Sequence, residues 1–529
     1  MLTIALTLLA AGAPAAADFD RGGYRAGAEP PELHDPADMA DPAAARPGGP
    51  LDPRSHGGLP GDDVDDSAAI QAALDAAAAA GGGVVPLSPG TWRLEAPLRI
   101  DHDGVVLRGA GSDVTVLDCP NSLADVHGWK PGWSWSGGFV QVAPAGGPSL
   151  TVGTVGASLA RDHVDLPLTL APDAEAPRSG EWLELAWFND TGADTLLLEL
   201  HGNHLPRSAM GKELRESSAA RVRTWVQVVS WMPGGPRERQ EELKDEEPGL
   251  PPRDPLARGD EPALSGLTPA GPHGTLTIEA PLRLDLRPEW SPTLTRRPSI
   301  REVGIEGLSF RFPETAYPGH LKERGYNGIQ LSRAIDCWVR DVATTNADSG
   351  LFLSHSKRVT ASGLHLAGRY MHHPISLSWS TDCLVEDWVI DARHRHGTTL
   401  SWSAHGNVLR RGEGLELALD CHRAAPFENL HEDLVVRFPG KPTQPLRSGG
   451  SSPRGPHAGR GNVYRNVELR FEEPGHRLVV RGQDEWPGAL FDGWRAVGGE
   501  LAFEPAPGIG QRVEGLGGGQ QADDLPPGE

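Results

Sequence analysis

The sequence predicts an all-β fold: a single-stranded parallel β-helix with an N-terminal capping α-helix and an inserted β-rich subdomain. Two observations predict it: a strand-like motif that recurs at nearly constant spacing, and an alanine-rich helical run that precedes it. The composition agrees, because 66 Gly and 48 Pro with 6% aromatic residues are typical of many turns and short strands. A chain of 529 residues is long enough for one long solenoid with an insertion.

The repeat lies in the second half of the chain. Its anchor motif ends in Leu-Ser, and successive copies start 22, 24 and 23 residues apart, which is the range of solenoid coils. The copies are residues 328–332 (GIQLS), 350–354 (GLFLS), 374–378 (PISLS) and 397–401 (GTTLS). A second run begins nine residues after each anchor, at Cys337, Val359, Cys383 and Gly406, and an inward-facing column follows at Val339, Ala361, Val385 and Val408. Short runs at constant spacing indicate strands stacked coil on coil.

Residues 61–94 predict how the solenoid begins. Asp66 is a good helix N-cap, and Ile70 and Leu74 share one face of a helix that ends at Gly81. Strand-like runs follow at residues 84–87 and 91–94. This segment resembles the entry motif of the pectate lyase superfamily, in its rhamnogalacturonase/epimerase-like form. The resemblance implies a right-handed parallel β-helix, with the helix covering the first coil and its unpaired strand edges.

The remaining segments predict the domain boundaries. We expect a signal peptide at residues 1–17, a linker at 18–60, the cap and first coils at 61–125, a β-rich insertion at 126–300, the main β-helix at 301–500 and a tail at 501–529. The apolar N-terminus with its Ala15–Ala17 cleavage-like site predicts a secreted or periplasmic protein. In the insertion, extended runs such as residues 139–142, 181–185, 224–228 and 275–278 indicate strands of another kind.

Charge and cysteines limit the partners. A net charge of −22 argues against a nucleic-acid binder. Beyond the predicted signal peptide no apolar stretch approaches membrane-spanning length, so we expect no membrane contact after signal cleavage. We also expect a monomer. Cys337 and Cys383 lie two coils apart on one face, so their Cα atoms are expected about 9.6 Å apart, beyond the ~7 Å limit for a disulfide. We therefore expect free thiols in the core, with Cys119 and Cys421 unassigned.

The candidate site is the ladder of polar turns before the anchor strands. Because the coils stack in register, residues 346–349, 369–373, 393–396 and 420–423 are expected to lie one above another, with the loop 314–327, which carries Tyr317 and His320, beside them. The expected catalytic residues are Tyr370, His372, His373, His396, Asp348 and Asp420. The expected substrate-binding residues are Tyr326, Arg369, Arg395, His422 and Arg423.

This cluster suits β-elimination on a uronate-containing polysaccharide. A cation must neutralise the sugar carboxylate, a base such as His372, His373 or His396 removes the adjacent proton, and Tyr370 or Tyr326 protonates the leaving oxygen. Arg369, Arg395 and Arg423 are expected to clamp carboxylates. The sequence therefore predicts an enzyme, a polysaccharide lyase.

Two other functions stay open. Residues 346–350 and 372–376 resemble part of the polygalacturonase pattern, which implies a glycoside hydrolase using Asp348 and Asp420. A non-catalytic β-helix that binds glycans or forms surface structure is the other alternative. No metal site is assigned, although Glu428 and Asp433 are candidate Ca²⁺ ligands. The loop 449–460 is expected to be a mobile flap, with Arg454 and His457 closing over a ligand.

Overall fold

In a computed structural model of the chain, residues 49–234, 272–481 and 486–520 are described, and they form two compact units. The first unit is a parallel β-helix, and the second, residues 147–190 and 219–298, is a β-barrel. The predicted signal peptide and most of the predicted linker lie outside the described residues. Among the described residues, no helix combines the length and the apolar character that a membrane span requires.

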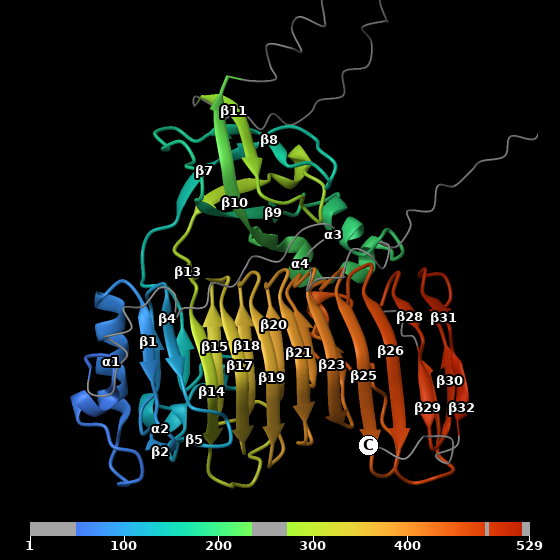
Figure 1. The fold of residues 1–529 in the computed structure, drawn as a ribbon. Coiled ribbons are helices and arrows are strands. Elements are labelled where there is room, and N and C mark those ends of the chain that lie inside the picture. The colour runs from blue at the N-terminus through green and yellow to red at the C-terminus, as the bar shows by residue number, and fades with distance from the viewer. Residues whose placement is uncertain (1–48, 235–271, 482–485, 521–529) are drawn as a thin grey trace, which may run out of the picture. The chain divides into compact units, whose positions relative to one another are not determined.

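The β-helix has stacked parallel sheets that follow the predicted repeat (Figure 1). One sheet carries the anchor motifs, in the order β3 (Leu98–Ile100), β6 (Val140–Val142), β15 (Asn327–Ser332), β18 (Ser349–Ser354), β20 (His373–Ser378), β22 (Thr398–Ser401) and β24 (Leu419–Cys421). Leu331, Leu353, Leu377 and Leu400 are direct neighbours in it, which confirms the predicted register. All four are fully buried, so the column forms the centre of the core.

A second sheet carries the runs that follow each anchor. Its main path is β1 (Gly83–Pro86), β4 (Val105–Arg108), β14 (Gly304–Arg311), β17 (Trp338–Thr345), β19 (Thr360–Ala367), β21 (Leu384–Ile390), β23 (Val408–Leu415), β25 (Leu430–Phe438), β26 (Val463–Phe471), β28 (Leu490–Asp492) and β31 (Arg512–Glu514). Beside this path lie β2 (Gly90–Arg93), β5 (Thr115–Asp118), β29 (Arg495–Val497) and β32 (Gly517–Gln520). Two small parallel pairs complete the coils: β13 (Ile300–Arg301) with β16 (Ala334–Ile335), and β27 (Arg477–Arg481) with β30 (Glu500–Glu504).

The predicted inward column is one residue out of register in its last coil. Val339, Ala361 and Val385 stack as expected, but Leu409 follows them, and Val408 pairs with Leu384 instead. The preceding turn explains the shift: Trp402 and Ser403 both have positive φ, at 51° and 50°, where the coil before has one such residue, Trp379, at the same turn. The turn therefore holds one extra residue.

The N-terminal helix closes the solenoid as predicted, but Asp66, the expected N-cap, does not cap it. Helix α1 (Ser67–Ala79) buries Ile70 and Leu74 completely or nearly so. The side chain of Asp66 does not cap it; its carboxylate instead accepts hydrogen bonds from the backbone N–H groups of Leu59 and Arg93, at 2.9 Å each. Asp66 thus ties residues before the helix to strand β2.

The unit boundaries differ from the expected ones. Leu51 is buried in the β-helix core beside the short helix η3 (Pro53–His56), so the fold begins before residue 61. Strand β6, predicted for the insertion, pairs with β3 and β15 in the β-helix, because its alternating Val140 and Val142 fit that core. Strands β31 and β32 extend the coils into the expected tail.

The inserted unit is a closed antiparallel barrel that contains three of the four predicted runs, residues 181–185, 224–228 and 275–278. Its strands, in barrel order, are β10 (Ala220–Pro233), β11 (His273–Ile278), β8 (Asp165–Leu170), β7 (Leu150–Val155), β12 (Thr293–Arg296) and β9 (Trp182–Phe188). The intervening residues 191–218 belong to the β-helix unit. They form α3 (Thr195–Leu200), η5 (Arg207–Met210) and α4 (Lys212–Glu216). The remaining short helices are α2 (Leu123–His127), η4 (Pro131–Ser134), η6 (Pro288–Trp290) and η7 (Ser452–Arg454).

The four cysteines are free and buried, in agreement with the prediction for Cys337 and Cys383. Their column continues in later coils as a buried ladder of Asn407, Asn429 and Asn462. The Oδ1 atom of Asn429 accepts from both the backbone N–H and the side-chain amide of Asn407, at 3.1 and 2.9 Å, and Asn462 does the same for Asn429. The ladder satisfies backbone groups at turns that water cannot reach.

His431 gives the fold a testable dependence on pH. It is buried, stacks on Tyr464, and its two ring nitrogens have no hydrogen-bond partner among the described residues. Burial lowers its pKa from 6.5 to about 3, so between these values the unfolded chain binds the extra proton. This part of the stability is complete above pH 6.5 and is lost as the pH falls, by up to about 1.4 kcal/mol per pH unit.

We expect His431→Phe to flatten this dependence, because phenylalanine keeps the stacking and cannot take a proton. Urea unfolding at pH 7 and pH 5 measures it, with exposed His102→Phe as the matched control. An unchanged pH slope in His431→Phe contradicts the assignment.

Candidate functional site

Three neighbouring anchor strands bring the predicted histidines together. His373 begins β20, His396 lies two residues before β22, and His422 directly follows β24, the strand that contains Asp420. Parallel register places Thr399 of β22 beside Asp420. We call His320, His372, His373, His396 and His422, with Asp420, the histidine cluster. His320 reaches it from the loop between β14 and β15.

The rings of the cluster are in direct contact. The centroid of the His396 ring lies 4.7 Å from that of His373, 4.5 Å from that of His422 and 5.2 Å from that of His372. The His320 ring lies 5.0 Å from His372. His372, His373 and His396 are buried, His422 is partly exposed and His320 is exposed. Solvent and ligands therefore approach the cluster from the side of His320 and His422.

Asp420 is a buried carboxylate at the base of the cluster. Its Oδ2 atom accepts hydrogen bonds from Nδ1 of His422 at 2.8 Å and Nδ1 of His396 at 3.1 Å, and its Oδ1 atom accepts from the backbone N–H of Gly449 at 2.8 Å. Burial raises the pKa of Asp420, but the charges and hydrogen bonds of His422 and His396 outweigh burial and hold it well below the usual range. Asp420 is thus an anion that orients two imidazoles.

A second buried carboxylate, Glu323, lies behind His372. It accepts hydrogen bonds from the hydroxyls of Ser134, at 2.6 Å, and Tyr317, and lies 3.5 Å from Nδ1 of His372. Nδ1 of His372 is 2.8 Å from the carbonyl oxygen of Ser134; since a carbonyl only accepts, Nδ1 carries the proton. Burial lowers the pKa of His372 to about 3, so its ring is neutral at ordinary pH.

The tyrosine and arginine candidates are divided between two places. The Tyr370 ring packs on Tyr317, with ring centroids 4.7 Å apart. Arg395 is exposed and lies near His320: burial is the largest cause that lowers the pKa of His320, and the positive charge of Arg395 is the second. The Arg423 guanidinium donates to the carbonyl oxygens of Gly450 and Gly455. Arg423 therefore binds the loop that contains Gly450 and Gly455, and its expected contact with a substrate carboxylate stays a prediction.

Asp348, Arg369 and Tyr326 form an adjacent group. Asp348 is 1% exposed; Nη2 of Arg369 donates to its Oδ1 at 2.6 Å, and the backbone N–H groups of Gly325 and Tyr326 donate to its Oδ2 at 3.0 and 2.9 Å. The Arg369 guanidinium also lies 5.5 Å above the Tyr326 ring. The three line a pocket of about 210 Å³ with residues of the loop 315–324. Asp348 and Arg369 thus neutralise each other.

The expected mobile flap is packed on the cluster. Gly449 donates to Asp420, and Arg454 stacks 4.5 Å above Trp402. A Cβ atom on Gly449 would lie 2.6 Å from Cε1 of His422 and closer still to Cε1 of His396. The loop therefore fixes both imidazoles, and only glycine fits where it touches them.

We expect Gly449→Ala to lower turnover at least about 10-fold while the fold persists, because the new methyl group displaces both rings and a small misplacement of reacting groups is costly. Gly440→Ala is the matched control, since a Cβ there meets nothing within 4 Å. Steady-state kinetics and circular dichroism of both variants test this. Equal turnover in the two variants contradicts the contact.

Two groups of side chains in the described residues are close enough to hold a metal ion. They are His320, His372 and His396, and His396, Asp420 and His422. The expected Ca²⁺ ligands Glu428 and Asp433 belong to neither group: Glu428 pairs with Arg460 and Asp433 accepts from Asn466. Imidazole nitrogens, and not carboxylates, dominate both groups.

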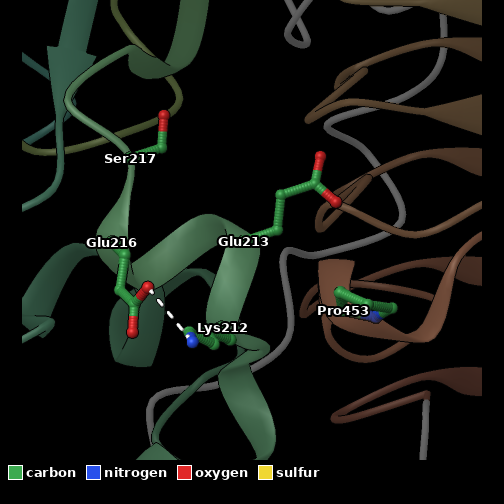
Figure 2. A pocket seen from close by; sticks show the side chains of 5 residues that line it. All are labelled: Lys212, Glu213, Glu216, Ser217 and Pro453. Atoms are coloured by element: carbon green, nitrogen blue, oxygen red, sulfur yellow. Dashed lines mark ion pairs between the residues drawn. The ribbon is translucent and has the colours of Figure 1, made fainter.

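A larger and shallower cavity lies elsewhere on the β-helix unit. Helix α4 and Pro453 of η7 border a space of about 400 Å³ lined by Lys212, Glu213, Glu216 and Ser217 (Figure 2). Lys212 and Glu216 form an exposed ion pair at 3.8 Å. These side chains are solvated surface groups, so the histidine cluster remains the candidate site.

Sequence reasoning missed three residues of this site. Glu323 and Gly449 lie in loops and Ser134 ends the short helix η4, all outside the coil period, and their partners lie up to 238 residues away in sequence. The sequence places Tyr317 and His320 in the loop 314–327 but indicates no role for either. The available signal was the length of the loop 314–327, which begins at the same edge of the coil as the polar turns.

One segment of the chain is similar to a known protein family. Residues 54–129 match the family model described as rhamnogalacturonase A/epimerase, pectate lyase-like. No curated protein matches the chain in sequence.

Twenty-three chains of solved structures match this chain, and three of them have TM-scores of 0.37 to 0.41. The tailspike of Pseudomonas phage phi297 is 11% identical, with 86% of this chain and 73% of that chain covered, at a TM-score of 0.38. A mannuronan C-5 epimerase A-module from Azotobacter vinelandii is 14% identical, with 90% of this chain and 100% of that chain covered, at a TM-score of 0.37. The tailspike of Pseudomonas phage LKA1 is 10% identical, with 89% of this chain and 79% of that chain covered, at a TM-score of 0.41.

The family match coincides with the capping helix and the first coils, where the sequence had already pointed. The stacked coils then continue the same architecture through the rest of the β-helix unit. In its fold the chain is a parallel β-helix protein, and its capping helix and first coils are similar to the pectate lyase-like family model.

Proposed function

We propose that this protein is a carbohydrate-active enzyme that cleaves a uronate-containing polysaccharide by β-elimination at the histidine cluster. The observation that carries the proposal is the pair of Asp420 and His422. A buried anion fixes Nδ1 of a partly exposed histidine, which leaves its Nε2 atom as a base. The pectate lyase-like family match supports a carbohydrate substrate.

The reaction needs three groups, and the site supplies a candidate for each. Arg395, exposed beside His320, neutralises the sugar carboxylate and so acidifies the adjacent carbon. His422 removes the proton from that carbon. As the carbon–oxygen bond to the leaving sugar breaks, a carbon–carbon double bond forms, and Tyr370 gives its phenolic proton to the departing oxygen. Bulk water later restores both groups.

The carboxylates support elimination over hydrolysis. A glycosidase of the polygalacturonase type needs one carboxylic acid that holds a proton and a second that acts as base. Asp420 is held as an anion by two histidines, and Asp348 is already bound by Arg369 and two backbone amides. Neither is arranged to protonate a glycosidic oxygen.

An aromatic stack beside the cluster supports glycan binding. The rings of His355, Trp379 and Trp402 follow strands β18, β20 and β22 and stack in order, with centroids 5.5 and 5.4 Å apart. The backbone N–H of Trp402 donates to the backbone carbonyl oxygen of Arg423, the residue after His422, so the stack adjoins the cluster. Partly exposed aromatic rings in a row offer apolar surface to sugar rings.

We expect Trp379→Ala to raise KM about 10-fold with little change in kcat, because the stack binds the sugar without touching the reacting atoms. Steady-state kinetics separate the two constants. A loss confined to kcat contradicts the binding role of the stack.

The experiment that tests the function is a substrate screen with two readouts. Pectate, alginate, rhamnogalacturonan and ulvan are each incubated with the full chain, and both ultraviolet absorbance and reducing sugar are followed. We expect absorbance from a new double bond on one uronate polymer. Reducing sugar without absorbance points to the hydrolase, and neither signal points to a non-catalytic binder.

A further inference from the structure

His320, His372 and His396 have the arrangement of a three-histidine metal site. Each offers one ring nitrogen, and the three nitrogens lie within 4.8 Å of one another. They come from three separate places, the loop after β14, the residue before β20 and the turn before β22, so the fold and not local sequence brings them together. A divalent ion held tetrahedrally by nitrogen bonds of about 2.0–2.1 Å sets its nitrogen ligands about 3.4 Å apart.

The outer nitrogen of each buried histidine is already occupied. Nδ1 of His372 donates to the carbonyl oxygen of Ser134 at 2.8 Å, and Nδ1 of His396 lies 3.1 Å from the carboxylate of Asp420. Metal-binding histidines characteristically donate their other ring N–H to a carbonyl or a carboxylate, which fixes both the tautomer and the ring orientation. Both supporting contacts are present.

The inner nitrogens lack the partner that burial demands. Nε2 of His372 and Nε2 of His396 are buried, on residues 1% and 5% exposed, and neither has a hydrogen-bond partner within the described part of the chain. Buried polar atoms are nearly always hydrogen-bonded, so two unpaired nitrogens within one cluster call for an explanation. With their Nδ1 atoms protonated, both Nε2 atoms carry a lone pair ready for a metal ion.

The chemistry of the donors selects the metal. Imidazole nitrogens suit Zn²⁺ and its neighbours, whereas Ca²⁺ and Mg²⁺ prefer oxygen. The nearby carboxylates of Asp420 and Glu323 offset the charge of a divalent ion. Asp420 itself is committed to His422 and Gly449, which disfavours the alternative group of His396, Asp420 and His422 as the binding set.

We infer that His320, His372 and His396 bind one Zn²⁺-type transition-metal ion, with a fourth position left for a ligand. Three histidines with one open position are typical of catalytic sites. If the proposed function holds, on which this role rests, the sugar carboxylate would occupy the open position, where the metal ion and Arg395 together neutralise its charge. Metal binding itself does not depend on that role.

Metal titration of the full chain tests the inference. After treatment with a chelator, ZnCl₂ is added and binding is followed by calorimetry, and CoCl₂ is added and its visible absorption is recorded. We expect one equivalent of Zn²⁺ and a tetrahedral Co²⁺ spectrum. His320→Ala, on an exposed loop and therefore harmless to folding, is expected to weaken Zn²⁺ binding by about 100-fold or more, beyond the 10–100-fold that loss of an outer partner costs.

Two matched variants separate the possibilities. His422→Gln and exposed His365→Ala are expected to keep the one-equivalent binding, since neither residue belongs to the proposed set. No Zn²⁺ binding by the chelator-treated wild type, or binding that survives His320→Ala but is lost in His422→Gln, overturns the inference. A chain that binds Zn²⁺ and cleaves no uronate polymer refutes the proposed function alone.

Discussion

His422→Ala lowers kcat on the cleaved polysaccharide by about 10²–10⁴-fold, the range that a positioned general base contributes. The expectation follows from its contact with Asp420 at 2.8 Å, which orients the ring, and from its partial exposure, which lets substrate reach it. KM changes little, because the base acts on the transition state. Steady-state kinetics on the substrate found in the screen measure both constants.

His365→Ala is the control for this variant, because His365 is an exposed histidine that pairs with Asp391 on another sheet of the solenoid. It is expected to retain wild-type kcat. A His422→Ala enzyme with full turnover removes His422 as the base and turns attention to His320, the other accessible ring of the cluster.

Asp420→Asn has the second large expected effect. The amide has the same shape but no charge, so His396 and His422 lose the anion that sets their tautomers. Because its NH₂ group cannot accept, either the two imidazoles or the backbone N–H of Gly449 also lose their acceptor. A comparable loss in the Ser-His-Asp proteases lowers kcat by about 10⁴-fold, and we expect a fall of at least 10²-fold here. The free energy of unfolding is expected to drop by about 3 kcal/mol as buried donors lose their acceptor.

Kinetics and urea unfolding check both parts of this prediction. Asp433→Asn, which alters an exposed carboxylate in strand β25, is expected to change neither quantity appreciably. Wild-type turnover in Asp420→Asn contradicts the orienting role of the carboxylate, whatever its effect on stability.

The periodic part of this molecule could be predicted from the sequence, because one physical rule repeats in every coil. Inward-facing leucines at one position per coil fixed the register of the anchor sheet, and that register placed His373, His396 and Asp420 on adjacent strands. Where a turn takes an extra residue, as at Trp402 and Ser403, the same rule fails by one position.

The aperiodic part could not be predicted in this way. Ser134, Glu323 and Gly449 reach the cluster from connecting segments whose course depends on packing with distant coils, and no local spacing encodes such contacts. The contacts of Arg423 could not be predicted for the same reason, since the loop carbonyls that bind it lie at Gly450 and Gly455. Burial also could not be foreseen: Asp348 is chemically suited to acid–base work, but the fold encloses it with Arg369.

Cleavage in water enriched in heavy oxygen tests the central claim most directly. In β-elimination the new end of the chain forms without the addition of water, so mass spectrometry of the products is expected to show no heavy oxygen and one unsaturated sugar per cut. Hydrolysis adds one water to every broken bond. Products that carry one heavy oxygen per cut and no double bond would contradict β-elimination at the histidine cluster.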